Sequence, residues 1–390
     1  MERVSYIART EGRLTVTGVP EGYDVWLAAE AALRLKGLVL FVVPDDLHAA
    51  GACAAARFFA PGVPVLSFPA WDCLPYDRVS PRPDIESTRL ATLSALARRT
   101  KDSGPALVVT TVNAVLQRVP PREAVLGASF AARVGDKVSH EKLALFLAHN
   151  GYVRTGTVRE PGDFALRGGI VDLWPPGERP LRLDFFGETL DAVRSFDAET
   201  QLSSGEVAAI ELLPAGEVPL DGDSISRFRS GYVAAFGPAG DDPLYESVSA
   251  GRHAQGMEHW LPLFYGKLET LFDFAPRALV MLGHYFDEAK AARLELIADY
   301  YETRRQFLKG DGAAKGALKS PPYKPLQPDR LYLTAEEWNQ ALARFAVRDL
   351  SPFQAPESMA SVDAGGKLGR DFAPERTQGR VNVFEGAAAH

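Results

Sequence analysis

The sequence predicts an α/β protein in which a parallel sheet is divided by an inserted small α+β domain. In the first third of the chain, continuous apolar runs alternate with segments of helical apolar spacing, which is typical of parallel strands joined by crossover helices. From about Pro120 the pattern changes to short strands separated by turn residues. After about Leu202 long helical segments and single apolar runs return, so the α/β pattern resumes behind the insertion.

In the first third, each element is expected from its apolar spacing. Helices are expected at residues 25–35, 47–59 and 85–99, and buried strands at residues 37–43, 63–68 and 106–111. Residues 68–77 (FPAWDCLPYD) contain two prolines, which cannot continue a helix. This segment is therefore predicted to be a long ordered loop.

The middle of the chain has the signals of a small α+β unit. Ser139 is expected to cap a short helix that Gly151 ends. Strands are expected at residues 152–159, 164–167 and 169–174, followed by a hairpin over 181–196 that turns at Gly187 and Glu188. Leu181, Leu183 and Phe185 alternate with polar residues, as in a half-buried antiparallel strand.

The last part of the chain is expected to complete the α/β domain. A helix is predicted at residues 286–307 and strands at 278–282 and 330–333. Residues 351–380 have little periodicity and are interpreted as a linker. The predicted divisions are 1–117 and 201–348 for the two parts of the α/β domain, 118–200 for the inserted domain, 349–380 for the linker, and 381–390 for the start of a further, truncated domain.

Composition limits the classes of protein to consider. The 390 residues are 46% hydrophobic and 24% charged, which fits several globular units and not a disordered chain. The apolar run at residues 38–43 is far shorter than a membrane span. Two cysteines, Cys53 and Cys73, cannot form a disulfide framework or a four-cysteine zinc site. The prediction is a cytoplasmic protein without a membrane segment, and its net charge of −7 restricts any nucleic-acid contact to a local patch.

The turn after the first expected strand is where an α/β nucleotide-binding protein holds phosphate. Here Thr17 stands at the first glycine position, and after Gly18 and Gly22 the lysine and hydroxyl positions are occupied by Tyr23 and Asp24. This degenerate phosphate loop predicts a structural turn, no bound cofactor and no ATPase activity. The alternative is a nucleotide-binding, ATPase or helicase-type domain that uses a loop without this pattern.

Other catalytic or metal sites are not indicated. The seven histidines are scattered, and the chain has no HExxH, CxxC or GxSxG motif. The sequence therefore predicts no catalytic residues and no metal ligands.

Arginine and aromatic residues gather in the middle of the chain. Arg154, Arg159 and Arg167 lie on or beside short predicted strands together with Phe164 and Trp174. Such residues on a rigid sheet are typical of protein interfaces. The alternative is that Arg154 and Arg159 pair locally with Glu160 or Asp163 while Trp174 fills the small core.

Two stretches resemble the front part of the bacterial transcription-repair coupling factor (Mfd) family. The first is residues 68–77 (FPAWDCLPYD) followed by Ser80-Pro81 and residues 84–90 (DIESTRL). The second is Gly151-Tyr152 with residues 160–175 (EPGDFALRGGIVDLWP) and 181–187 (LRLDFFG). The second pattern also resembles UvrB, whereas the coupling factors combine it with the first pattern and a degenerate phosphate loop.

The resemblance implies a degenerate, helicase-like (UvrB-like) parallel-sheet domain split by an inserted domain that binds UvrA. It implies a non-catalytic module that recruits UvrA to stalled RNA polymerase in transcription-coupled nucleotide excision repair. RNA polymerase, double-stranded DNA, ATP and magnesium would be bound by domains missing from this chain. Arg167 matches the family's partner-binding arginine, Arg154 lies near a second docking position that Arg159 could also supply, and Trp174 replaces a usual phenylalanine. A third hypothesis is that another domain of the full protein masks this surface.

Overall fold

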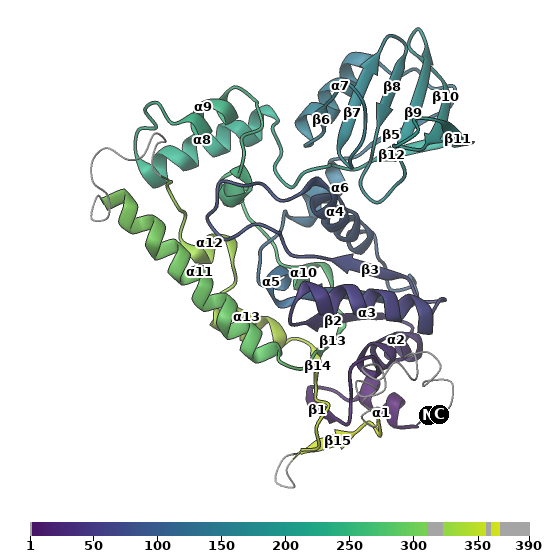
Figure 1. Cartoon of the computed structure of the whole chain (residues 1–390), viewed down its shortest axis with the longest axis vertical. Helices are drawn as coiled ribbons and strands as arrows, with labels where there is room; N and C mark the ends of the chain where they lie inside the picture. Colours follow the sequence, from purple (N-terminus) through teal and green to yellow (C-terminus); the bar gives the residue numbers. More distant parts are fainter. Residues whose placement is uncertain (1, 310–322, 356–359, 367–390) are drawn as a thin grey trace, which may run out of the picture.

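A computed structural model describes residues 2–309, 323–355 and 360–366 (Figure 1). It contains a seven-stranded sheet, a six-stranded sheet and a two-stranded sheet. The seven-stranded sheet is entirely parallel. The six-stranded sheet belongs to a separate lobe that is attached beside α4 (Pro83–Ala97). The predicted fold class, an α/β domain with an inserted smaller domain, is therefore confirmed.

The seven-stranded sheet joins segments from both ends of the chain. Its strands, in spatial order, are β15 (Ser361–Asp363), β1 (Arg13–Thr17), β14 (Ala346–Leu350), β13 (Leu279–Leu282), β2 (Leu38–Val43), β4 (Ala106–Thr111) and β3 (Val65–Phe68). Both faces are covered, because Leu40 and Val42 of β2 belong to one buried cluster while Val39, Phe41 and Val43 belong to another. Such two-sided burial explains why these strands are continuous apolar runs.

Different helices cover the two faces of this sheet. One face packs on α1 (Glu2–Arg9), α2 (Tyr23–Leu35) and α3 (Asp46–Phe59). The helices of the other face are α4, α5 (Val112–Val115), α6 (Arg122–Gly127), α10 (Leu271–Phe274), α11 (Phe286–Lys309) and α13 (Ala335–Leu342). The predicted helices and strands of the first third are thus present, with small differences at their ends.

The inserted lobe is an antiparallel sheet with one covering helix. Its strands, in spatial order, are β11 (Ser203–Glu206), β10 (Thr189–Phe196), β9 (Leu181–Phe186), β8 (Ile170–Leu173), β7 (Asp163–Arg167) and β6 (Val153–Arg154), with only the β6–β7 pair parallel. The two-stranded sheet pairs β5 (Phe130–Arg133) with β12 (Ala209–Leu212). Ser139 caps α7 (His140–His149), as predicted. The strands of this lobe run from Phe130 to Leu212, and the boundaries at 118 and 200 stay predictions.

A helical lobe follows the insertion. It consists of α8 (Gly222–Phe236), α9 (Pro243–Ser249) and a 3-10 helix, η1 (Met257–Leu263), with α12 (Pro328–Leu331) nearby. Trp71 and Tyr76 from the loop at residues 68–77 are buried in its apolar cluster. The proline-rich loop is therefore ordered, as predicted, because its aromatic side chains fill this core.

Three local predictions are wrong. Residues 330–333 do not form a strand, since Pro328 starts the helix α12 and only Tyr332 makes an isolated bridge, to Gln117. The strand expected at 152–159 is limited to β6 because a turn follows, in which Thr155 donates to the Thr157 carbonyl. The predicted linker contains β15, which pairs with β1. The other residues of the predicted linker, 356–359 and 367–380, and the truncated domain predicted at 381–390 lie outside the described residues.

Candidate functional site

One face of the six-stranded sheet is covered by no helix of the described residues. Leu143 and Leu147 of α7 share a buried cluster with Val171 and Leu183 of the sheet, so α7 covers that face. We call the opposite face the outer face. Because side chains alternate along a strand, the register places Arg167, Ile170 and Asp184 side by side on the outer face.

Two arginines of the outer face are neutralised within the sheet. Arg182 donates from Nε and Nη2 to both carboxylate oxygens of Asp172, at 2.7 and 2.9 Å. Arg194 donates to Asp184 at 2.7 Å. Asp172 is almost completely buried, so its ion pair is part of the structure of the sheet.

Three other arginines of this lobe have no such partner. Arg167 is exposed at the end of β7 and donates to the Gly156 carbonyl and, at 3.0 Å, to the Thr157 hydroxyl, which are neutral acceptors. Arg154 on β6 and Arg159 in the β6–β7 loop are also exposed. Within residues 2–309, 323–355 and 360–366, none of these three side chains forms an ion pair with a carboxylate. Three positive charges without a carboxylate partner in the described residues therefore lie on β6, in the β6–β7 loop and at the end of β7.

The local pairing alternative does not describe this geometry. Asp163 accepts the backbone N–H groups of Arg159 and Glu160, at 2.9 and 3.1 Å, and not the guanidinium of Arg159. The Asp163 carboxylate therefore holds the turn in shape and, within the described residues, forms no ion pair with the Arg159 guanidinium.

The two predicted aromatic residues are less accessible than the arginines. Phe164 is 3% exposed and packs in the core beneath α7. Trp174 is half-buried against Val158, Ala165 and Phe196, and its Nε1 donates to the Glu178 carbonyl at 3.0 Å. Phe164 thus supports the sheet, and Trp174 supports the loop beside Arg167.

An exposed phenylalanine was missed by the sequence reasoning. Phe186, at the tip of the β9–β10 hairpin, is 84% exposed, and Ile170 is 36% exposed. The signal was present in the alternation, since placing Leu183 and Phe185 inward turns Phe186 outward. Of the two exposed apolar residues, Ile170 lies directly beside Arg167 on the outer face.

The degenerate phosphate loop lies between β1 and α2. Its backbone amides already have acceptors: Val19 donates to the Ser351 carbonyl, Tyr23 to the Pro20 carbonyl, and Gly22 to the Asp24 carboxylate at 2.9 Å. The Asp24 oxygen also accepts the Val25 N–H at 2.7 Å. A carboxylate of the protein thus occupies amides that a phosphate would need.

The segment after β15 covers the same turn. Ala364 donates to the Thr17 carbonyl, Gly366 donates to the Gly18 carbonyl, and the Tyr23 hydroxyl donates to the Ala364 carbonyl at 3.2 Å. Tyr23 also stacks on Trp26 with ring centroids 5.1 Å apart. Tyr23, the residue at the lysine position of the motif, is therefore part of a packed contact between the turn after β1 and the segment after β15.

A cavity of about 610 Å³ beside this turn is lined by Glu21, Asp24 and His48 among other residues, but by no lysine or arginine of the described chain. Burial raises the pKa of the Asp24 carboxyl, and the nearby Glu21 carboxylate raises it further. These residues do not fit a nucleotide, because a triphosphate needs the opposite charge.

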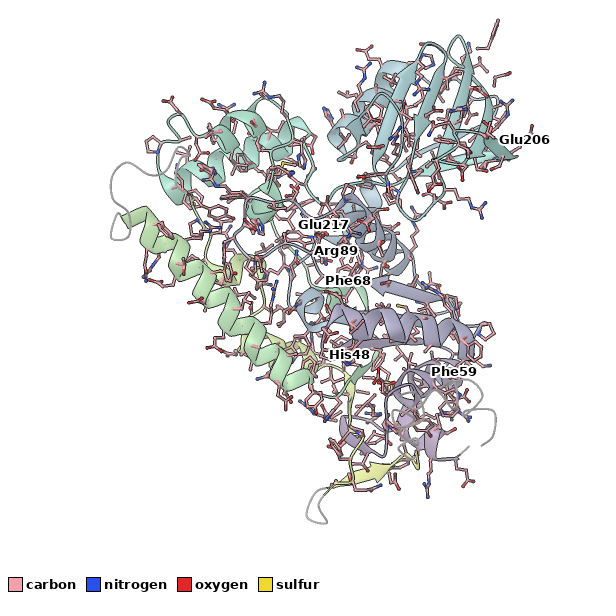
Figure 2. The ribbon with its side chains drawn as sticks, viewed as in Figure 1. His48, Phe59, Phe68, Arg89, Glu206 and Glu217 are labelled. Atoms are coloured by element: carbon pink, nitrogen blue, oxygen red, sulfur yellow. The ribbon has the colours of Figure 1, made fainter. Side chains whose placement is uncertain are left out.

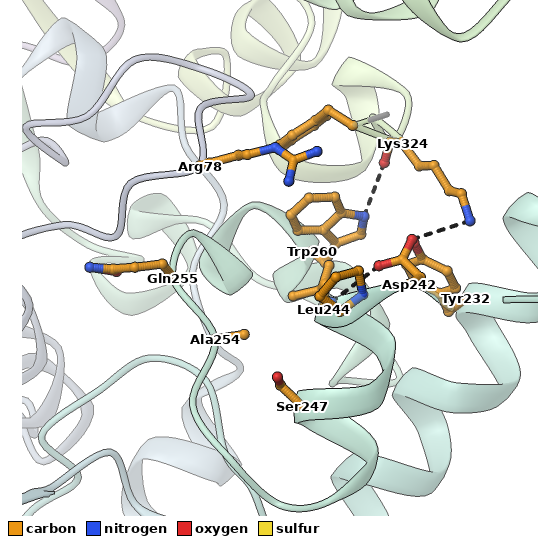
Figure 3. Close-up of a pocket in the computed structure, with 11 residues that line it drawn as sticks. Arg78, Tyr232, Asp242, Leu244, Ser247, Ala254, Gln255, Trp260 and Lys324 are labelled. Atoms are coloured by element: carbon orange, nitrogen blue, oxygen red, sulfur yellow. Dashed lines mark hydrogen bonds and ion pairs between the residues drawn. The ribbon is translucent and has the colours of Figure 1, made fainter. Parts of the chain in front are cut away.

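A smaller cavity of about 260 Å³ lies between the helical lobe and Arg78 (Figure 3). Asp242 at its wall accepts the Tyr232 hydroxyl at 2.5 Å and pairs with Lys324 at 3.2 Å. Its polar groups largely bond with one another, so it is best explained as a packing feature of this lobe. No group of three or more His, Cys, Asp or Glu side chains in the described parts of the chain could hold a metal ion. Among the helices of those parts, none is long and apolar enough to cross a membrane.

Comparison with known proteins agrees with this architecture. A protein-family profile described as UvrB interaction domain matches residues 130–217, which span the inserted lobe. The transcription-repair-coupling factor of Escherichia coli (strain K12) is 33% identical over 356 residues, covering 90% of this chain and 29% of the relative. That of Haemophilus influenzae is 30% identical over 328 residues, covering 83% and 27%. That of Myxococcus xanthus is 30% identical over 363 residues, covering 88% and 28%.

This chain spans less than a third of the length of these relatives. The similarity nevertheless extends over most of the chain and includes both the parallel-sheet domain and the inserted lobe. The chain therefore belongs to the transcription-repair-coupling factor family, of which it is an N-terminal, UvrB-like region.

Proposed function

We propose that this chain is a non-catalytic docking module that recruits UvrA to stalled RNA polymerase in transcription-coupled nucleotide excision repair. One observation supports this most directly: Arg154, Arg159 and Arg167 are exposed on one lobe without a carboxylate partner in the described residues, whereas Arg182 and Arg194 of the same sheet are paired. The match of residues 130–217 to a UvrB interaction domain supports the choice of partner.

Binding would use charge-assisted hydrogen bonds around an apolar contact. The guanidinium of Arg167 is held by the Gly156 carbonyl and the Thr157 hydroxyl, so its position is set before a partner arrives. Preorganised guanidinium groups bind carboxylates in a fixed geometry and lose little entropy on binding. Phe186 and Ile170 supply exposed apolar surface on the same face, which fits an interface with an apolar centre and a charged rim.

The non-catalytic part of the proposal is supported by the phosphate loop. Its amides bond to Asp24 and to main-chain carbonyls, and Tyr23 packs against Trp26. RNA polymerase, double-stranded DNA, ATP and magnesium would be bound by other parts of a longer protein, since the chain covers less than a third of its relatives.

The decisive experiment is a titration of UvrA with wild-type chain and with Arg167→Glu at moderate salt. Reversing this charge should weaken binding by about 2–4 kcal/mol, because a carboxylate would then face the acidic groups of the partner. The matched control is Arg57→Glu, the same charge change on the exposed surface of α3. Equal affinities for wild type and Arg167→Glu would remove Arg167 from the interface, and no binding by wild type would refute the docking role.

Two other functions give different results. A nucleotide-hydrolysing domain would release phosphate from ATP in the presence of magnesium. For this chain we expect no phosphate release above the rate measured without protein. If another domain of the full-length protein masks the docking surface, UvrA should bind this chain more tightly than it binds the full-length protein.

A further inference from the structure

A positively charged cavity lies at the amino ends of the parallel strands, whereas the phosphate loop lies at their carboxyl ends. It has a volume of about 580 Å³ and is lined by Gly37 and Leu38 at the start of β2 and by Ala278 just before β13. Its size is within the range of about 300–1,000 Å³ that is usual for small-ligand sites.

Five basic residues from separate segments line this cavity. They are Lys36 after α2, Arg99 and Lys101 after α4, Arg122 at the start of α6, and Arg277 before β13. In the part of the chain that the structure describes, none of the five forms an ion pair. The one acidic residue in the lining, Asp273, accepts the backbone N–H and the hydroxyl of Thr270, at 2.9 and 2.7 Å. The local charge is thus strongly positive in a protein whose net charge is −7.

Two half-buried arginines of this cavity, Arg122 and Arg99, are held by hydrogen bonds. Arg122 donates to the Ala97 and Asp273 carbonyls at 2.8 and 3.1 Å, and its guanidinium lies 5.0 Å from the centre of the Phe274 ring. Arg99 donates to the Gly104 carbonyl. Burial lowers the pKa of Arg99, so an anion nearby would offset the cost of holding this charge away from water.

Helix ends explain only part of this cluster. Basic residues are favourable after the carboxyl end of a helix, which accounts for Lys36 and Arg99. Arg122, however, is the first residue of α6, where a positive charge is unfavourable, and Arg277 precedes a strand. A bound anion would account for all of these positions together.

We propose that this cavity binds phosphate groups, carried either by a nucleotide or by a nucleic-acid strand. Five cationic side chains around one cavity suit a ligand with several negative charges, and arginine and lysine are the usual phosphate-binding side chains. Buried Leu96 and Phe274 give the cavity an apolar floor beneath these cations. These positive charges thus lie at the amino ends of the strands. The degenerate phosphate loop lies at the carboxyl ends, and its residues Glu21 and Asp24 repel phosphate.

The test measures binding of three probes to the 390-residue chain at about 50 mM salt without magnesium, since phosphate contacts weaken steeply as salt rises. Inorganic pyrophosphate and ATP are titrated by calorimetry, and a short fluorescent single-stranded DNA by anisotropy. The variant is Lys101→Glu/Arg277→Glu, two exposed positions in turns. The matched control is Arg57→Glu/Arg252→Glu, which changes the net charge equally at two exposed positions outside this cavity.

We expect at least one probe to bind, and the cavity variant to weaken it about tenfold or more while the control stays within about twofold. Binding of ATP or pyrophosphate would indicate a nucleotide, and binding of DNA alone a strand. The proposal is overturned if no probe binds wild type, or if both double variants weaken binding equally. The cavity variant should still bind UvrA, which shows that it is folded and separates this result from the docking proposal.

Discussion

The buried ion pair between Arg89 and Glu217 joins the first and second parts of the α/β domain. Arg89 of α4 and Glu217, which follows the inserted lobe, lie side by side (Figure 2), and both side chains are 0% exposed. Glu217 also accepts the Trp71 Nε1 proton at 3.3 Å, and Arg89 donates to the Pro69 carbonyl at 2.8 Å while stacking 4.3 Å from the centre of the Phe68 ring. The motif at residues 68–90 thus anchors the point where the chain returns from the insertion.

Replacing Arg89 by Met should destabilise the protein by about 3–5 kcal/mol. The methionine keeps most of the apolar packing on Phe68, but the Glu217 carboxylate then stays buried with Trp71 as its remaining side-chain donor. Removing one partner of a buried pair typically has this cost. With a denaturant dependence of about 3 kcal/mol per M, the urea midpoint should fall by about 1–1.7 M.

The assay is urea unfolding followed by tryptophan fluorescence for wild type, Arg89→Met, Glu217→Gln and the double variant. Glutamine keeps an acceptor for Trp71 and removes the buried charge, so the double variant should recover on the order of 2 kcal/mol relative to the sum of the single changes. If the two losses simply add, the pair is not coupled and this reasoning is wrong.

Two further changes test the same junction. Burial raises the pKa of the Glu86 carboxyl well above its usual value of 4.5, and the nearby Glu258 and Glu217 carboxylates raise it further. Because the pKa is higher in the folded state, the contribution of Glu86 to stability is present at low pH and is lost as pH rises above about 4.5, the value in the unfolded chain. Glu86→Gln should therefore be progressively favoured over wild type from pH 4.5 to 8 in urea midpoints, and the opposite trend would contradict the assignment. Gly151 has a φ of 82°, and a Cβ added there would clash with the Gly216 backbone. Gly151→Ala should therefore lower the free energy of unfolding by about 1–3 kcal/mol in the same assay. An unchanged urea midpoint would show that the Gly216 backbone moves to accommodate the methyl group.

Much of the fold could be predicted from the sequence because its signals are local. The apolar run of β2, the capped helix α7 and the hairpin turning at Gly187 each depend on residues that are neighbours in the chain. The loss of the phosphate loop was also readable, since it depends on which residue types stand at Tyr23 and Asp24. Of the candidate site, the arginines and their sheet were predicted, while their role in binding stays a prediction.

Tertiary structure alone decided which side chains meet across long separations. Arg89 and Glu217 are 128 residues apart, β15 becomes a strand only by pairing with β1, and the basic cavity combines residues from Lys36 to Arg277. Whether an arginine of the described residues has a carboxylate partner, like Arg182, or only neutral acceptors, like Arg167, likewise depends on the strand register. Local periodicity therefore determines the elements, and the packing of distant elements determines where their charges are buried, paired or left open.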